Sequence, residues 1–339
     1  MELSLRGTPG LAIAIDEASQ VGQARRSSLQ MATQLGFDDN DSGRVALVAT
    51  ELATNVIKHG RGGSIYLREA PGRQGMGVEL TAVDRGPGFD LAACLQDGFS
   101  TSGTNGIGLG AVQRQAQVMD AYADHRGSVV MARIYPRQSP GSADIRFGVV
   151  VLPIHGEHYC GDGWALAMKH TLCSVMVVDG LGHGEAASIA AVAAQDAFLS
   201  EPLAEPAALM GQLHQGMTGT RGGAVAIARL DLGQGTMRFA GIGNISAGLV
   251  SPQGTRGLAS HPGIVGSQFR RAQAFDFSDI IGQLLIMHSD GLQSRWRMAN
   301  YPGLSSRHPA VIAAVLHRDF SRNRDDATVV VIALERMHG

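Results

Sequence analysis

The chain has 339 residues, 44% of them hydrophobic and 17% charged, and its 28 Lys and Arg residues against 30 Asp and Glu residues give a net charge of −2. At about 150 residues per domain, this length predicts two domains. The near-neutral charge argues against a nucleic-acid-binding protein, three scattered cysteines argue against a disulfide framework, and the lack of a long apolar run argues against membrane insertion, so we expect a cytoplasmic protein.

The first part of the chain is expected to form a two-layer α/β sandwich. Apolar residues recur three and four positions apart before Gly60, which predicts a helix from Asp41 or Ser42 to about His59. Its apolar face consists of Val45, Val48, Leu52 and Val56. Two segments with strand character follow, and glycines open a further helix. These expected elements are the strands Ser64–Arg68 and Val78–Val83 and the helix Gly106–Met119. Strands with helices to one side favour the sandwich.

A segment rich in proline, glycine and serine, residues 136–142, separates two strand-like runs, Ser128–Ile134 and Ile145–Pro153. We therefore expect domains over residues 1–136 and 143–339, with a linker over 137–142. The second domain is expected to be a layered sandwich of sheets covered by helices. Its expected strands are Leu172–Val178, Ala224–Leu230, Met237–Ala240, Leu284–His288 and Thr328–Leu334, and its expected helices lie at about 185–199, 205–215 and 308–318.

One polar stripe stands out on the helix before Gly60. Glu51 and Asn55 are four residues apart and Lys58 follows three later, so the three side chains share one edge of the helix. A carboxylate, an amide oxygen and an ammonium group in this arrangement could hold a hydrated Mg²⁺ and a triphosphate. By itself, the stripe is equally compatible with a solvated helix face.

Two glycine-containing segments extend this pattern. In Asp84-Arg85-Gly86-Pro87-Gly88 the aspartate ends a strand, where its carboxylate can accept a hydrogen bond from an exocyclic amine such as adenine N6. Gly106-Ile107-Gly108-Leu109-Gly110 precedes a helix, whose free N–H groups can face an anion. The glycines do not form a phosphate-binding loop of the Gly-x-x-x-x-Gly-Lys-Ser/Thr kind, and their place in the chain argues against a dinucleotide fold.

Together these three segments resemble the nucleotide boxes of the GHKL ATPase superfamily, most closely its small serine/threonine switch kinases (RsbT-like), over roughly residues 5–135. The resemblance implies ATP with Mg²⁺ in a Bergerat fold, with Glu51 as general base, Asn55 as Mg²⁺ ligand and Asp84 as adenine-binding residue. Residues 90–105 would be a lid, and Ser128 stands where the family usually has threonine. The further pocket residues are Lys58, Gly86, Gly88, Gly106, Gly108, Gly110 and Ser128.

Four acidic loops mark a second site. They are Cys160–Gly163, Val178–Gly184, His288–Gly291 and Arg324–Thr328. Three of them adjoin expected buried strands, and adjacent strands of one sheet could bring these ends together. Two unit charges ~4 Å apart repel by about 4 kcal/mol at an effective dielectric of 20. Two divalent cations would offset this repulsion and could activate a bridging water, and carboxylate and carbonyl oxygens suit Mg²⁺ or Mn²⁺.

These loops resemble the metal-dependent protein phosphatases (PPM family) in their SpoIIE-like branch, with RsbX-like pieces at Gly241–Asn244 and Leu285–Leu292, over about residues 143–336. The resemblance implies two Mn²⁺ or Mg²⁺ ions held by catalytic carboxylates and one carbonyl. These ligands are Asp162, Asp179, the Gly180 carbonyl, Asp290 and Asp325. No arginine matches the phosphate-binding arginine of some eukaryotic members, so phosphate binding is left to the metals. His183, between glycines, is expected to serve turn geometry rather than acid catalysis.

The two resemblances predict a bacterial partner-switching enzyme with an ATP-dependent serine/threonine kinase domain and a phosphoserine/phosphothreonine phosphatase domain. The expected partner is a STAS-domain antagonist or a stressosome-like scaffold, or else a sigma factor. One alternative stays open at this point: the ATP-binding domain is a non-catalytic module that sequesters a sigma factor or a scaffold protein, while only the phosphatase turns over.

Overall fold

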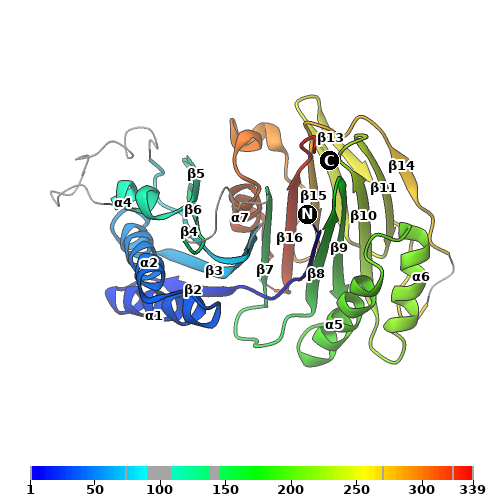
Figure 1. Ribbon diagram of the computed structural model, residues 1–339, viewed down its shortest axis with the longest axis horizontal. Coiled ribbons are helices and arrows are strands. Elements are labelled where there is room, and N and C mark those ends of the chain that lie inside the picture. Colours follow the sequence, from blue (N-terminus) through cyan, green and yellow to red (C-terminus); the bar gives the residue numbers. More distant parts are fainter. Residues whose placement is uncertain are drawn as a thin grey trace. The chain divides into compact units, whose positions relative to one another are not determined.

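The computed structural model describes residues 2–72, 75–89, 108–137, 146–268, 271–322 and 324–337. The chain divides into two compact units (Figure 1). We call one of them the N-terminal unit; it contains Gly10–Arg146 and Ser306–Arg318. The C-terminal unit contains the chain up to Pro9, Phe147–Ser305 and the chain from Asp319 onward. Each unit therefore includes one segment from the opposite side of the expected boundary at 136–142.

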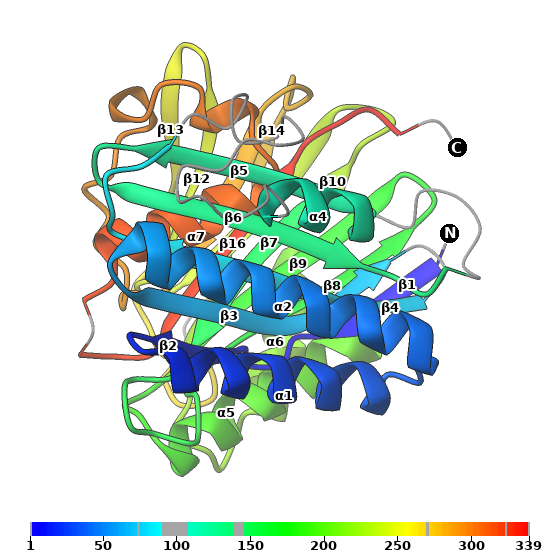
Figure 2. The same cartoon turned by 90° about the vertical axis from the view of Figure 1, so that its left-hand side faces the viewer.

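The N-terminal unit is built on a five-stranded antiparallel sheet with helices on one face (Figure 2). In spatial order the strands are β2 (Leu11–Ile15), β3 (Gly63–Gly72), β4 (Gly75–Asp84), β6 (Gly127–Ile134) and β5 (Val118–Asp124). The helices are α1 (Ala18–Gln34), α2 (Asp39–Gly60) and the short α4 (Gly108–Gln115). Ile65 and Leu67 of β3 pack in one core cluster with Val45, Val48 and Leu52 of α2.

The other face of this sheet carries polar side chains. Tyr66 alternates with Ile65 and Leu67 along β3, as the two-residue period of a strand requires. Its hydroxyl lies 3.1 Å from His317 Nδ1 on α7 (Pro309–Phe320), and both residues belong to this unit. A buried ion cluster lies nearby on the sheet, in which Glu79 pairs with Arg68 at 3.0 Å and with Arg133 at 2.7 Å. The helix α7 is thus part of the N-terminal unit up to Arg318.

Two antiparallel sheets form the C-terminal unit. The first has the order β1 (Glu2–Arg6), β8 (Asp162–Lys169), β9 (Leu172–Gly180), β10 (Gly223–Asp231), β11 (Thr236–Ile242) and β14 (Phe275–Phe277). The second has the order β13 (Gly254–Leu258), β12 (Ser246–Ser251), β15 (Leu284–His288), β16 (Ala327–Ala333) and β7 (Phe147–Leu152). Phe147 and Trp164 join the two sheets, with ring centroids 5.6 Å apart. Helices α5 (Glu185–Ser200) and α6 (Pro206–Gly216) pack on the first sheet.

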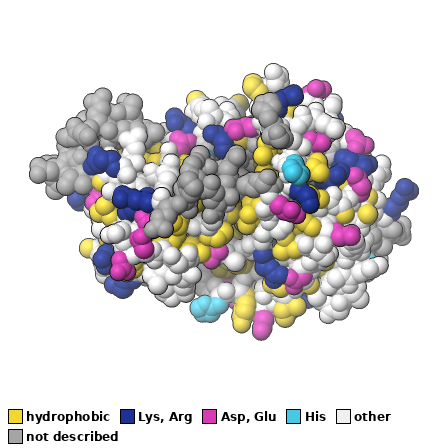
Figure 3. Space-filling model, in the orientation of Figure 1, with side chains coloured by type: hydrophobic (Ala, Val, Ile, Leu, Met, Phe, Trp, Pro, Cys, Tyr) yellow, Lys and Arg dark blue, Asp and Glu magenta, His cyan; other side chains and the backbone are white. Residues whose placement is uncertain are grey.

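The expected fold class is confirmed, with one helix in a different form. The helix expected over Gly106–Met119 is described from Gly108 and ends at Gln115, because the residues from Val118 onward pair with β6 as strand β5. Gly106 lies outside the described residues. No helix in the described ranges is long and apolar enough to cross a membrane. Acidic and basic side chains are interspersed over the face shown in Figure 3.

Candidate functional site

The polar stripe of α2 lies on the edge of a helix whose other side is fixed in the core. Asp38 begins the helix by accepting a hydrogen bond from Asp41 N at 2.7 Å, and Arg61 ends it in a left-handed conformation with φ 58°. Glu51 and Asn55 are half-buried and Lys58 is exposed. Burial raises the pKa of Glu51, and the positive charge of Lys58 opposes that rise. The stripe therefore presents a carboxyl group whose proton affinity is increased.

Asp84 is the last residue of β4, and the structure brings it together with Ser128. Its Oδ1 accepts hydrogen bonds from Gly86 N at 2.8 Å and from Ser128 N at 3.2 Å, and Ser128 Oγ donates to Oδ2. A side chain at Gly86 could not fit, because a Cβ there would lie 2.7 Å from the carbonyl oxygen of His59. Gly88 has φ +77°, which glycine adopts without strain. Asp84 is thus held, nearly buried, beside the end of α2.

The start of α4 lies beside the polar stripe. A Cβ on Gly108 would be 3.8 Å from Asn55 Oδ1, so the first described residue of α4 is a neighbour of Asn55. Gly110, two residues further along the helix, is buried. The lid expected over residues 90–105 lies outside the described residues, as Gly106 does. The described residues therefore place an amide oxygen next to a helix N-terminus, whose N–H groups favour anions.

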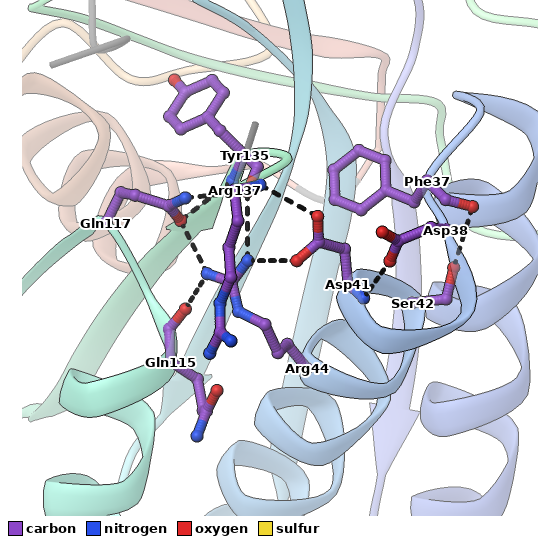
Figure 4. Close-up of polar contacts among 9 residues, drawn as sticks. All are labelled: Phe37, Asp38, Asp41, Ser42, Arg44, Gln115, Gln117, Tyr135 and Arg137. Atoms are coloured by element: carbon purple, nitrogen blue, oxygen red, sulfur yellow. Dashed lines mark hydrogen bonds and ion pairs between the residues drawn. The ribbon is translucent and has the colours of Figure 1, made fainter. Parts of the chain in front are cut away.

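A buried arginine ties these elements together and was not identified from the sequence (Figure 4). Arg44, on α2, donates to Asp41 Oδ1 at 2.7 Å and to the Tyr135 carbonyl at 3.2 Å. It also donates to the Gln115 carbonyl at the end of α4 and to Gln117 Oε1 at 3.0 Å. Although burial opposes it, hydrogen bonds from Arg137 N and Arg44 lower the pKa of Asp41. Arg44 therefore joins the helix of Glu51 and Asn55 to the helix of Gly108.

The four aspartates of the second site come from two facing sheets and not from adjacent strands of one sheet. Asp162 begins β8 and lies directly opposite Asp179 of β9 in the antiparallel register. Asp290 follows β15 and Asp325 precedes β16, two neighbouring strands of the other sheet. The expectation that adjacent strands of one sheet gather these loops is wrong, because β8 and β9 belong to one sheet whereas β15 and β16 belong to the other.

Hydrogen bonds hold these loops in register across the sandwich. Ser289 Oγ donates to Asp162 Oδ2 at 2.6 Å and accepts from Thr328 N at 3.0 Å, so one hydroxyl joins three loops. Asn244 Nδ2 donates to Asp290 Oδ2 at 2.7 Å. The sequence pattern contains both residues but did not identify these contacts, since they depend on tertiary packing.

Asp326 has a different environment from its neighbour Asp325. It is buried, and its carboxylate accepts hydrogen bonds from Ile154 N at 2.7 Å and Gly161 N at 2.6 Å. Asp325 is exposed. Both carboxylate oxygens of Asp326 therefore accept backbone hydrogen bonds, whereas the side chain of Asp325 is accessible for a ligand.

The electrostatics of the cluster disfavour four ionised carboxylates. Burial first, and then the charges of Asp290 and Asp325, raise the pKa of Asp179 to about 7. Burial and Asp179 also raise the pKa of Asp162. Burial and Asp325 raise the pKa of Asp290, while the charge of Arg322 opposes the rise. The charges of neighbouring aspartates therefore add to burial in raising the pKa of Asp162, Asp179 and Asp290.

The donor set fits hard divalent cations. Within the described ranges, no three acidic, histidine or cysteine side chains are gathered closely enough to hold one ion. Mg²⁺ does not need three such ligands, because it keeps several waters and takes one or two carboxylates. Asp162, Asp179, the Gly180 carbonyl, Asp290 and Asp325 offer carboxylate and carbonyl oxygens, the donor type that Mg²⁺ and Mn²⁺ prefer. His183 lies outside this set, with Nδ1 3.4 Å from Glu157 Oε1 and an exposed ring.

Comparisons with known proteins match two separate parts of the chain. Residues 14–134 match the histidine kinase-like ATPase domain, and residues 170–335 match stage II sporulation protein E (SpoIIE). The chain is 36% identical over 101 residues to the serine/threonine-protein kinase RsbT of Bacillus subtilis strain 168, covering 30% of this chain and 74% of RsbT.

Two solved structures are also similar to this chain. One is from work on the bacterial stressosome, a modular system that has been adapted to control secondary messenger signalling. It matches with 28% identity and a TM-score of 0.51, covering 55% of this chain and 97% of that one. The phosphatase domain and a regulatory fragment of SpoIIE from Bacillus subtilis match with 14% identity and a TM-score of 0.49, covering 95% of this chain and 96% of that one.

Proposed function

Because this chain belongs to the RsbT family of serine/threonine kinases and joins that domain to a SpoIIE phosphatase domain, we propose that it both adds and removes a phosphoryl group on a partner protein. The proposed partner is a STAS-domain antagonist or a stressosome-like scaffold. The observation that carries the phosphatase half is the group of four mutually repelling carboxylates drawn from two sheets. The pairing of Asp84 with Ser128, and the closeness of Asn55 to α4, support the kinase half.

In the proposed kinase site, each residue has a role set by its position. Asp84 binds the amine of adenine, and Asn55 is the side-chain ligand of Mg²⁺. Lys58 faces the phosphates as a cation, together with the N–H groups at the start of α4. Glu51 accepts the proton of the partner's hydroxyl, and its burial supports this role by raising its pKa. These residues position the reactants and balance charge, which is the main task of a protein in phosphoryl transfer.

In the proposed phosphatase site, Asp162, Asp179, Asp290, Asp325 and the Gly180 carbonyl hold two Mn²⁺ or Mg²⁺ ions. Such ions supply a nucleophile at neutral pH and neutralise charge on the phosphoryl oxygens. The residues of the chain fix where the ligands stand. Ser289 orients Asp162 and Asn244 orients Asp290 by donating a hydrogen bond to one oxygen of each carboxylate. Hydrolysis then breaks the bond between phosphorus and the serine or threonine oxygen of the partner.

The experiment that tests this function uses the full chain, radiolabelled ATP and a candidate STAS-domain protein. Asp290→Ala removes the phosphatase, so labelled partner accumulates, whereas Asn55→Ala yields no labelled partner. The wild-type chain with Mn²⁺ releases labelled phosphate from the purified phosphopartner, and EDTA stops this release. Asn40→Ala, an exposed residue of the same helix as Asn55, is the matched control and behaves as wild type.

The two halves of the proposal can fail separately. If the Asp290→Ala chain binds ATP but labels no partner, the kinase half is wrong and the N-terminal unit is a binding module that sequesters a sigma factor or scaffold. If the wild-type chain releases no phosphate in the presence of Mn²⁺, the phosphatase half is wrong.

A further inference from the structure

Two exposed arginines stand next to the loops of the carboxylate cluster. The Leu181 N–H donates to the Gly222 carbonyl at 2.9 Å, which places Arg221 beside the loop that follows Asp179. A Cβ on Gly182 would lie 3.0 Å from Arg221 Nη1, so the guanidinium itself reaches this loop. On the other sheet, Arg322 N donates to the Gly291 carbonyl at 2.9 Å, one residue after Asp290. Each arginine is thus fixed by its backbone beside one proposed metal-ligand loop.

Neither guanidinium is held by a hydrogen bond or an ion pair within the described residues. The charge of Arg322 does act on Asp290, where it opposes the rise in the pKa of that carboxyl group. Other arginines of the same unit behave differently: Arg229 pairs with Glu205 at 2.7 Å, and Arg238 pairs with Asp276 at 2.8 Å. The donors of Arg221 and Arg322 therefore remain available to a ligand.

The chemistry of that ligand follows from the surrounding charge. A guanidinium offers a planar fork of N–H donors that matches two oxygens of a phosphoryl group. With the carboxylate charges offset by the proposed metal ions, positive charge at the rim of the cluster attracts a phosphate dianion. We propose that Arg221 and Arg322 bind the phosphoryl oxygens of the phosphoserine or phosphothreonine substrate. This inference rests on the proposed phosphatase function and replaces the expectation that metals alone bind the phosphate.

The test measures hydrolysis of p-nitrophenyl phosphate by the full chain with Mn²⁺ and without ATP. In Arg221→Ala and in Arg322→Ala, the KM for this substrate and the inhibition constant of inorganic phosphate each rise about tenfold, while kcat changes little, because the interaction binds substrate and transition state alike. Lysine at either position restores part of the affinity, since it keeps the charge without the fork. Arg336→Ala leaves both constants unchanged, because this exposed residue contacts the Gly233 carbonyl beyond the opposite end of β10.

Two further measurements separate phosphate binding from a structural role. Calorimetric titration with Mn²⁺ gives the same metal affinity in the variants as in the wild type, and their melting temperatures agree. Unchanged KM and phosphate inhibition in both variants would overturn the inference, as would a rise in KM that merely follows weaker Mn²⁺ binding. If the wild-type chain itself shows no Mn²⁺-dependent hydrolysis, the proposed phosphatase function fails and this inference fails with it.

Discussion

Asp179 is buried and lies among like charges, so its carboxyl group binds a proton more tightly than a free aspartate does. Its pKa rises from 3.8 to about 7 in the folded, metal-free chain, so between these values the folded state binds more protons than the unfolded state. The free energy of unfolding therefore falls as pH rises through this window. We predict that Asp179→Asn, which keeps the shape but not the charge, stabilises the chain in EDTA at about pH 8 and has little effect near pH 4.

Urea unfolding of both chains at several pH values measures this difference. Histidines that titrate in the same range, such as the buried His317, contribute equally to both chains and cancel. Asp279→Asn provides the control, because Asp279 is exposed and its left-handed backbone suits asparagine. A difference that does not change with pH would show that Asp179 is not held among like charges. With Mn²⁺ present, the sign at pH 8 reverses, because the wild-type carboxylate then stabilises through the ion.

Some residues of both candidate sites could be predicted because they lie in short sequence motifs. Asp84 and Asp290 each stand at a strand end before glycine, a local pattern that can be read in the sequence. The residues that hold them were not predictable in this way. Ser289 reaches Asp162 across 127 positions, and Ser128 reaches Asp84 across 44, and no local pattern encodes such a pair.

At the scale of elements, local patterns predicted α2, α5 and β15 almost to the residue, because the two helices have regular apolar faces and β15 is an uninterrupted apolar run. It extended α4 too far, since β5 pairs with β6 and tertiary pairing overrides helix propensity there. It also passed over Arg44, a cation near the start of a helix, where the helix dipole disfavours positive charge. That unfavourable placement was the one available signal of a buried role.

Arg44 gives a prediction about how α2 and α4 are joined. Arg44→Ala leaves the buried Asp41 carboxylate without its partner and removes the link to Gln115, so we expect a loss of about 3–5 kcal/mol in the free energy of unfolding. Denaturant unfolding of the full chain measures the loss. Arg25→Ala on the exposed side of α1 should stay near the wild type. A loss below about 1 kcal/mol would mean that the network of Figure 4 is dispensable.

At the scale of the whole molecule, the two units exchange segments of chain. The strand β1 completes an edge of a C-terminal sheet through pairing with β8 from Glu2–Lys169 to Arg6–Ala165. The segment Ser306–Arg318 belongs to the N-terminal unit, where Arg307 pairs with Asp120 at 3.3 Å and Arg318 with Asp124 at 3.7 Å. Composition marks a linker between two domains, but it carries no information about such an exchange, which depends on contacts between distant segments.

This exchange predicts that the N-terminal unit is incomplete without its distant helix. A fragment that ends at Arg146 lacks His317, Arg307 and Arg318, which contact Tyr66, Asp120 and Asp124, and the polar face of its sheet loses a cover. We expect this fragment to melt at a lower temperature, with a broader transition, than the same fragment carrying residues 306–318 on a flexible linker. Calorimetry with and without Mg-ATP compares the two, and a scrambled 306–318 segment provides the control. Equal melting of the fragments with native and scrambled segments would show that the helix contributes nothing specific to the ATP-binding fold, and that the predicted boundary at 136–142 divides two self-sufficient domains.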